Sequence, residues 1–134
     1  PEGLEENVEL TRAFIKSLGY DKVVIGGFSQ GAMLSSHLLG ELNSRLKGCV
    51  LFSGNLISEP SLEKKLSEAK NKDVAIYQSH GTRDPILGFN GALRLEKLLK
   101  DSGFAVEFHE FQGQHEIPMS VIQSWGLFMQ RCLL

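Results

Sequence analysis

The stretch from residue 23 to residue 39 constrains this chain more than any other part of its sequence. A β-branched run, Val-Val-Ile at residues 23–25, leads into a Gly-x-Ser-x-Gly motif centred on Ser29, and a helical pattern begins at Gln30. A strand, a tight turn and a helix in this order are the context that a nucleophile elbow requires. We therefore expect Ser29 to adopt a strained backbone angle above the sheet, in front of the N-terminus of the helix.

Glycines occupy both positions two residues from this serine. We expect a Cβ at Gly27 or at Gly31 to clash, because the strand and the helix pass close together at such a turn. The alternative is a glycine-rich connection in which Ser29 only caps the helix. The choice depends on whether an acid and a histidine follow in suitable loops.

Composition indicates an ordinary globular domain. The 134 residues are enough for one domain with a buried core, and 42% hydrophobic and 22% charged residues are typical of such a protein. A net charge of −2 and the lack of any Lys/Arg cluster argue against nucleic-acid binding. The longest apolar runs are far shorter than the about 20 residues of a membrane-spanning helix, so we expect no integral membrane segment.

Neither metal nor phosphate chemistry is indicated. Cys49 and Cys132 lie in apolar segments and are interpreted as reduced core residues, although a disulfide between them stays open. The cysteines and histidines lack the spacing of metal ligands, and the sequence has no phosphate-binding glycine loop. The chain begins at Pro1 without a methionine, so cytoplasm is only the default location and a signal peptide ahead of Pro1 stays open.

Four strands are expected to alternate with helices. The strands are predicted at residues 22–28, 49–52, 74–77 and 105–111, and the helices at 3–18, 30–42, 61–70, 91–101 and from 118 onward. This alternation predicts parallel βαβ units with right-handed crossovers, and hence an α/β sheet covered by helices on both faces. In the first helix, one face is expected to be buried, made of Leu4, Val8, Phe14, Ile15 and Leu18.

An acid and a histidine follow Ser29 in loops at the carboxyl ends of later strands, where ligands of parallel sheets bind. A serine hydroxyl becomes a strong nucleophile only when a base takes its proton, and a third group must orient that base. Asp84 follows the third strand and His115 follows the fourth, which gives the chain order serine, acid, histidine. We predict that Ser29, His115 and Asp84 form a catalytic triad.

Other residues of the same types are placed less well. Asp73 precedes a strand, Asp101 ends a helix and Glu116 adjoins the predicted base. His37 lies within the helix after the motif. His80 lies at a strand end, where its ring would order the acid loop by hydrogen bonding, and His109 lies on the polar side of an edge strand.

The tetrahedral intermediate of acyl transfer also needs hydrogen-bond donors for its oxyanion. The backbone N–H of Gln30, directly after the nucleophile, is one candidate, helped by the helix N-terminus. A second donor normally comes from a loop after an earlier strand. Since no strand is predicted before Val23, we expect that donor to be missing from this chain.

Four segments carry a resemblance to a known family. They are Gly-Gly-Phe-Ser-Gln-Gly-Ala-Met at 26–33, Phe-Ser-Gly at 52–54, His-Gly-Thr-Arg-Asp-Pro at 80–85 and His-Glu-Ile at 115–117. Together they resemble the phospholipase/carboxylesterase family of α/β-hydrolases, the group that contains acyl-protein thioesterases and small bacterial carboxylesterases. The resemblance extends along the whole chain. It implies the α/β-hydrolase fold, Ser29, Asp84 and His115 as the triad, and the N–H of Gln30 as one oxyanion donor.

The resemblance also implies a substrate class. It predicts a shallow groove for short- to medium-chain acyl esters or thioesters, including a lysolipid or an acylated protein, and no cofactor. Apolar residues of the strand-end loops are candidates for its wall: Leu56, Ile57, Ile86, Leu87 and Ile117. The alternative is that these side chains form local core beneath their loops.

The chain departs from the family at its beginning. The family's full domain has several strands before the strand that corresponds to residues 23–27. We therefore expect residues 1–134 to be a single, partial α/β-hydrolase domain, the C-terminal larger part, with the N-terminal strands missing. The strand at residues 23–27 would then expose a flat apolar edge, which would pair with a second copy as a homodimer or be completed by an N-terminal segment.

Two functions of different classes follow. The leading hypothesis is a serine carboxylesterase or acyl thioesterase that uses a Ser-His-Asp triad and an acyl-enzyme intermediate. The alternative is a truncated, catalytically incompetent fragment that acts as a binding or oligomerisation module. A dienelactone hydrolase is disfavoured, because those enzymes usually have cysteine at the position of Ser29.

Overall fold

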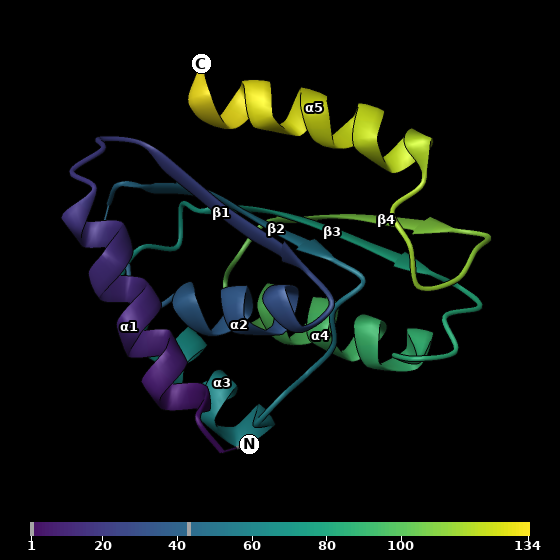
Figure 1. Cartoon of the computed structure of the whole chain (residues 1–134), viewed down its shortest axis with the longest axis horizontal. Helices are drawn as coiled ribbons and strands as arrows, with labels where there is room; N and C mark the ends of the chain where they lie inside the picture. Colours follow the sequence, from purple (N-terminus) through teal and green to yellow (C-terminus); the bar gives the residue numbers. More distant parts are fainter. Residues whose placement is uncertain (1, 43) are drawn as a thin grey trace.

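The computed structural model of the chain describes residues 2–42 and 44–134, in which helices alternate with strands (Figure 1). In chain order these elements are α1 (Leu4–Ser17), β1 (Val23–Phe28), α2 (Gln30–Leu38), β2 (Leu46–Phe52), α3 (Glu59–Glu68), β3 (Ala75–Gly81), α4 (Phe89–Asp101), β4 (Val106–Phe111) and α5 (Met119–Leu133). Within the two described ranges, every helix is too short or too polar to span a bilayer.

The strands form one parallel sheet in the order β1-β2-β3-β4, so each strand pairs with the next one along the chain. Figure 1 shows α5 on one face of this sheet and the helices α1 to α4 on the other. The predicted α/β fold, with helices on both faces of a parallel sheet, is therefore confirmed. Because the strands are parallel, the loops that follow them all open at the same end of the sheet.

Two hydrophobic clusters fill the two sides of the sheet. The larger lies between the sheet and α1 to α4, and the smaller lies beneath α5, where Tyr77 packs with Val121 and Phe128. Successive residues of a strand point to opposite faces, so the neighbours Val50 and Leu51 of β2 belong to different clusters. This arrangement explains why β1 and β2 contain continuous apolar runs rather than alternating ones.

Several element boundaries differ from the predicted ones. The helix after the serine ends at Leu38 rather than near residue 42. The second strand begins earlier, at Leu46, because this side chain is only 2% exposed and its backbone already pairs with Val23. The third strand continues to Gly81, so His80 lies at the end of this strand as predicted.

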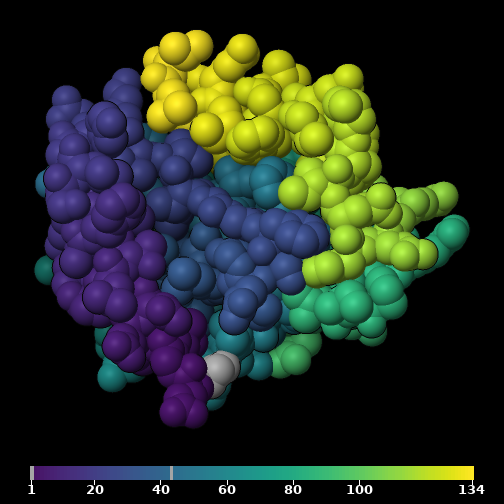
Figure 2. All heavy atoms as spheres, in the orientation of Figure 1, coloured from purple at the N-terminus to yellow at the C-terminus, as the bar shows by residue number. Residues whose placement is uncertain are grey.

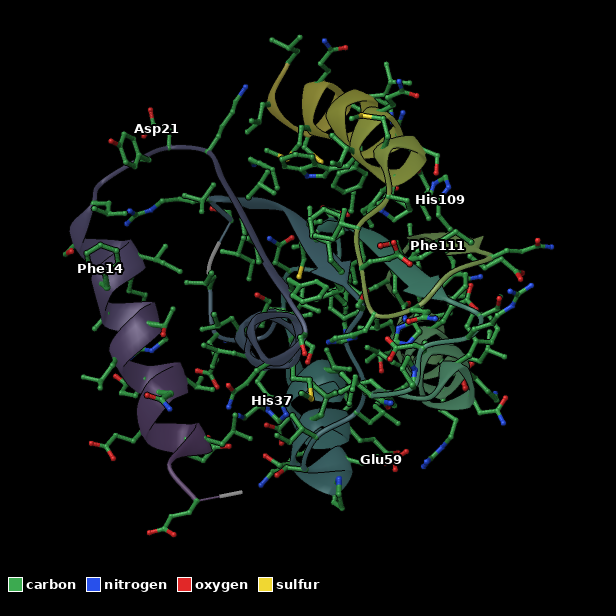
Figure 3. The ribbon with its side chains drawn as sticks, turned by 45° about the vertical axis from the view of Figure 1, so that its right-hand side comes forward. Phe14, Asp21, His37, Glu59, His109 and Phe111 are labelled. Carbon is green, nitrogen blue, oxygen red and sulfur yellow. The ribbon has the colours of Figure 1, made fainter. Side chains whose placement is uncertain are left out.

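The buried face of α1 also differs from the predicted one. Phe14 (labelled on α1 in Figure 3) is 63% exposed and Leu18 is 47% exposed, whereas Val8 is 3% exposed and Ile15 packs against the larger cluster. Val8 and Ile15 are two helical turns apart and share a face. Phe14 and Leu18 instead share a face with Leu10, which is also exposed. The prediction that Phe14 and Leu18 point inward is therefore wrong.

Ser29 is flanked by Gly27 and Gly31, and among the described residues only Gly27 lacks the space for a side chain. A Cβ at Gly27 would lie 2.3 Å from the carbonyl carbon of Gly31, so the strand and the first turn of α2 meet as expected. A Cβ at Gly31 would meet nothing within 4 Å. The predicted clash at Gly31 is therefore wrong, because its missing side chain would point into open space.

β1 is an unpaired edge of the sheet in the part of the chain that the structure describes. Figure 2 shows its segment at the surface between α1 and α5. A groove of 290 Å³ lies beside this edge, lined by β1 and β2 residues and by Trp125 and Met129 of α5. An edge strand presents free N–H and C=O groups to any strand that can reach it, so β1 is a candidate pairing surface.

We expect the chain to associate through this edge. Val24→Lys should raise the dissociation constant about tenfold or more, equivalent to ~1.4 kcal/mol, because a charge on an edge strand disfavours pairing. Light scattering across a concentration series measures the effect. Leu127→Lys, at a residue 60% exposed on α5, is the matched control and should change nothing. A chain that stays monomeric at every concentration would contradict the expectation.

Candidate active site

Ser29 stands at the turn between β1 and α2. Its backbone angles, φ 58° and ψ −114°, lie outside the regions that residues with a side chain normally adopt. Its N–H donates to the carbonyl oxygen of Phe52 at the end of β2, at 2.9 Å. Its hydroxyl makes no capping hydrogen bond to α2, so it is available to another partner. Strain of this kind is typical of functional positions.

That partner is His115. Its Nε2 lies 2.9 Å from the Ser29 hydroxyl, and its Nδ1 lies 2.7 Å from Oδ2 of Asp84. Both distances are within hydrogen-bonding range, with the Nδ1–H donating to the carboxylate and Nε2 accepting from the hydroxyl. The ring of Phe28 lies 4.8 Å from the imidazole, centroid to centroid, and covers part of it. The structure thus brings together the three residues that the sequence nominates, from the ends of three different strands.

The carboxylate of Asp84 is surrounded by hydrogen-bond donors. Its Oδ1 accepts from the backbone N–H groups of Ile86 and Leu87, each at 2.8 Å. Burial of the side chain by itself raises the pKa of Asp84, but the two N–H groups and His115 together outweigh burial and hold that pKa below its usual range. Asp84 is therefore ionised at neutral pH and able to orient an imidazole.

His80 supports the same loop from within β3. Its Nε2–H donates to the carbonyl oxygen of Leu87 at 2.7 Å, and the same nitrogen lies 3.3 Å from Oδ2 of Asp84. The ring is completely buried. The predicted hydrogen bonding between His80 and the acid loop is confirmed.

The loop that carries His115 packs directly against the end of β3. The N–H of Arg83 donates to the carbonyl oxygen of Gly113 at 2.9 Å. Gly81 leaves no room for a side chain, because a Cβ there would lie 2.3 Å from the carbonyl oxygen of Gln114. The acid loop and the histidine loop are therefore fixed to each other through backbone contacts.

Gln30 opens α2, so no carbonyl one turn earlier in the helix accepts its N–H. The positive end of the helix dipole lies at the same place. Gln30 also lines a pocket of 310 Å³ together with Met33 and Ile57. An anion formed next to the Ser29 hydroxyl would thus face an N–H donor, and an apolar group could lie beside it.

The other residues predicted to line an acyl groove lie in different environments. Leu56 packs against the larger cluster and Ile117 against the smaller one, on opposite faces of the sheet. Ile86 is 67% exposed, and Leu87 contributes its backbone to the acid loop. A common wall formed by all five residues therefore stays a prediction.

His37 and His109 lie far apart from each other (Figure 3), and their hydrogen bonds go to groups other than Ser29, Asp84 and His115. His37 is completely buried and lies 2.8 Å from the carbonyl oxygen of Ile57 through Nε2. Burial lowers the pKa of His37, although this hydrogen bond opposes the shift. His109 lies 2.7 Å from Glu107 and 3.2 Å from Ser124 beneath α5. The hydrogen bonds of both rings therefore help to hold helices and loops against the sheet.

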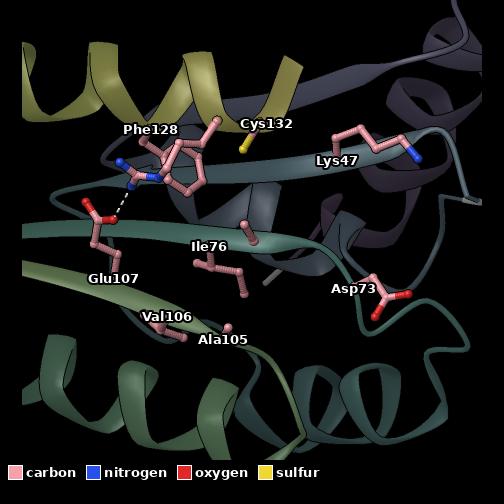
Figure 4. Close-up of a pocket in the computed structure, with 10 residues that line it drawn as sticks. Lys47, Asp73, Ile76, Ala105, Val106, Glu107, Phe128 and Cys132 are labelled. Carbon is pink, nitrogen blue, oxygen red and sulfur yellow. Dashed lines mark hydrogen bonds and ion pairs between the residues drawn. The ribbon is translucent and has the colours of Figure 1, made fainter. Parts of the chain in front are cut away.

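Another pocket, of 460 Å³, lies beside α5 at the amino ends of β2, β3 and β4 (Figure 4). Its walls include Asp73, Val106 and the ion pair between Arg131 and Glu107. Ligands of parallel sheets bind at the opposite, carboxyl ends, where Ser29 lies. Among residues 2–42 and 44–134, no group of three His, Cys, Asp or Glu side chains is arranged to hold a metal ion.

Sequence reasoning missed the groups that hold the loops of Asp84 and His115 in place. The hydroxyl of Ser53 donates to the carbonyl oxygen of Glu116, at 3.2 Å, and the N–H groups of Ile86 and Leu87 bind Asp84. An aspartate followed by proline often hydrogen-bonds the backbone two or three residues on, so this turn could have been foreseen. No local signal connects Ser53 with a loop 63 residues away.

Comparison with known proteins is consistent with this arrangement. The sequence matches the phospholipase/carboxylesterase family over residues 5–133. The chain belongs to this family. Acyl-protein thioesterase 1 of Debaryomyces hansenii is 34% identical over 119 residues, which cover 84% of this chain and 51% of the relative. Acyl-protein thioesterase 1 of Candida albicans is 30% identical over 120 residues, covering 83% and 52%.

The chain thus spans about half the length of these phospholipase/carboxylesterase relatives. Solved structures with a similar fold also match this chain. Esterase PE8 is 27% identical with a TM-score of 0.85, and the match covers 98% of this chain and 62% of that one. Arabidopsis thaliana SOBER1 is 24% identical with a TM-score of 0.86, covering 98% and 65%. The family membership and the α/β-hydrolase fold that the motifs predicted are confirmed.

Proposed function

We propose that the protein is a serine hydrolase that cleaves acyl esters or thioesters through a covalent acyl-enzyme. The observation that carries this proposal is the continuous hydrogen-bonded line from Ser29 through His115 to Asp84, with distances of 2.9 Å and 2.7 Å. Family membership and the names of the relatives, acyl-protein thioesterases, support the same reaction class. No specific observation favours a purely non-catalytic module.

The geometry is suited to a two-step reaction. The Ser29 oxygen attacks the acyl carbon while its proton passes to Nε2 of His115, and the negative charge moves to the carbonyl oxygen beside the N–H of Gln30. Collapse of this intermediate breaks the bond to the leaving oxygen or sulfur, which takes the proton from Nε2. A water molecule then attacks the acyl-enzyme by the same route and releases the acid and free Ser29.

Substrate placement belongs to the same proposal. An apolar acyl chain would lie against the loops that surround the triad, where Ile57 and Met33 flank a pocket beside Gln30. Short- to medium-chain acyl groups suit such an open site. The three members of the proposed triad follow β1, β3 and β4, so the site needs strands from most of the chain and the chain forms one functional domain.

A fluorophosphonate probe tests the nucleophile. We expect it to label the protein at Ser29 and to lose all labelling in Ser29→Ala. Ser124→Ala is a matched control, because Ser124 also lies 3.2 Å from a histidine, but the Nε2 of His109 that faces it is the same atom that contacts the carboxylate of Glu107 at 2.7 Å. Absence of labelling in the unmodified protein, or labelling that survives Ser29→Ala, would contradict the proposal.

Acyl-length preference is tested with p-nitrophenyl acetate and p-nitrophenyl octanoate. If the acyl chain is bound by apolar residues, kcat/KM should be at least about tenfold higher for the octanoate, since two buried CH₂ groups at ~0.8 kcal/mol each suffice for this ratio. Equal values would show that the chain beyond the first carbons is not bound.

A further inference from the structure

The carbonyl that follows His115 is held by a buried side chain from the end of β2, two strands away from β4 in the sheet. The hydroxyl of Ser53, directly after β2, donates to the carbonyl oxygen of Glu116 at 3.2 Å. We propose that Ser53 is a positioning residue, which keeps the imidazole of His115 within proton-transfer distance of Ser29. This inference rests on the proposed function, because it assigns a role in the same hydrolytic site.

The backbone of Ser53 indicates that its side chain is needed there. Its φ is 53°, in the left-handed region that glycine adopts without strain and that other residues rarely adopt. Strained conformations of this kind persist where the surrounding contacts hold them, and they gather at functional sites. Ser53 is completely buried, and its N–H donates to the carbonyl oxygen of Ser79 at 2.9 Å. A glycine would satisfy the backbone at this position but would lack the hydroxyl.

The histidine loop is attached on both sides of His115. Before it, the carbonyl of Gly113 accepts the N–H of Arg83 at 2.9 Å. After it, the carbonyl of Glu116 accepts the Ser53 hydroxyl at 3.2 Å. Within the loop, the carboxylate of Glu116 also accepts the N–H of Gln114 at 2.9 Å. The first contact joins the loop to the residues that follow β3, and the second joins it to the residue that follows β2. Along the chain, His115 therefore lies between two carbonyl groups that are held by hydrogen bonds.

Loss of the second attachment should free the loop on one side. The side chain of His115 is 17% exposed, so part of the ring faces solvent and has no packed neighbour there to hold it if the loop moves. A displacement of 1 Å in a reacting group costs up to about 10²-fold in rate. The chemical step should therefore be slowed, while binding of a small ester, which does not use this loop carbonyl, should change little.

Ser53→Gly is the sharpest variant, because it removes the hydroxyl and relieves the backbone strain together. We expect kcat for p-nitrophenyl acetate to fall about 10- to 100-fold with little change in KM. Ser79→Ala is the matched control. Ser79 is also completely buried in the adjacent strand, but its hydroxyl has no hydrogen-bond partner among the described residues. Its kcat should stay within about twofold of the unmodified protein, since no contact with the site is lost.

A spectroscopic measurement separates positioning from hydrolysis. In ¹⁵N-histidine-labelled protein, the Nδ1–H signal of His115, identified by its loss in His115→Ala, reports the hydrogen bond to Asp84. We expect Ser53→Gly to broaden or abolish this signal and Ser79→Ala to leave it sharp. An unchanged signal and unchanged kcat in Ser53→Gly would overturn the role of Ser53. If the unmodified protein neither turns over ester nor reacts with the fluorophosphonate, the proposed function fails, and the signal still decides the positioning role.

Discussion

Replacing His115 with alanine is expected to lower kcat by several orders of magnitude, up to about 10⁶-fold. The Ser29 hydroxyl would lose the acceptor that lies 2.9 Å away, so no group would take its proton during attack. The effect on folding should be modest, because the His115 side chain is in a strand-end loop and is not part of either hydrophobic cluster. Steady-state turnover of p-nitrophenyl acetate and thermal unfolding measure the two effects separately.

The combination with Ser29→Ala makes this prediction sharper. Groups that act as one unit lose their contribution together, so the double variant should be no less active than either single one. His37→Ala is not a suitable control because that ring is buried, whereas His109→Asn replaces a half-buried histidine outside the site. We expect His109→Asn to retain most activity. A double variant whose loss is the product of the two single losses would show that Ser29 and His115 act independently.

Asp84→Asn should lower kcat by about 10⁴-fold, the loss typical of a triad whose acid becomes an amide. Oδ1 of the new side chain can still accept from the N–H groups of Ile86 and Leu87, so the loop should keep its shape. The amide NH₂ would then face the Nδ1 of His115, where Oδ2 now accepts at 2.7 Å. Two donors cannot pair, so the imidazole is pushed into the tautomer that leaves no free Nε2 lone pair for Ser29.

The matched control is Asp101→Asn, at an exposed carboxylate that pairs with Lys97 at 2.8 Å. Surface pairs of this kind contribute little, so activity and stability should be almost unchanged. Equal activity of Asp84→Asn and the unmodified protein would remove Asp84 from the triad.

The same variant should change how stability depends on pH. The pKa of Asp84 is lower in the folded protein than its ordinary value of 3.8, so its ionised form stabilises the fold. This contribution is fully present above pH 3.8 and is lost as the pH falls through the lower folded-state pKa. Asp84→Asn lacks it at every pH. Thermal unfolding measured from neutral pH downward should therefore show a constant difference between the two proteins above pH 3.8 and a shrinking one below it.

The chemistry-bearing residues could be predicted from the sequence because each lies beside a strong local signal. Ser29 is between glycines after a β-branched run, and Asp84 and His115 follow apolar strands in the required order. Parallel strands place their carboxyl ends together, so this order alone was enough to bring the three side chains into one region. The face of α1 could not be predicted as well, since Phe14 and Leu18 are apolar but point outward.

Periodicity, turn residues and motifs are local properties of the chain, so they were sufficient to predict the α/β class, the family and the chain order of Ser29, Asp84 and His115. The contacts that hold those side chains within hydrogen-bonding distance of one another became visible only in the folded chain. The hydrogen bond from Ser53 to Glu116 and the 2.3 Å limit at Gly81 join segments from different strands. Such contacts depend on how the sheet packs and on the space between loops, and the order of residues along the chain carries no direct record of either.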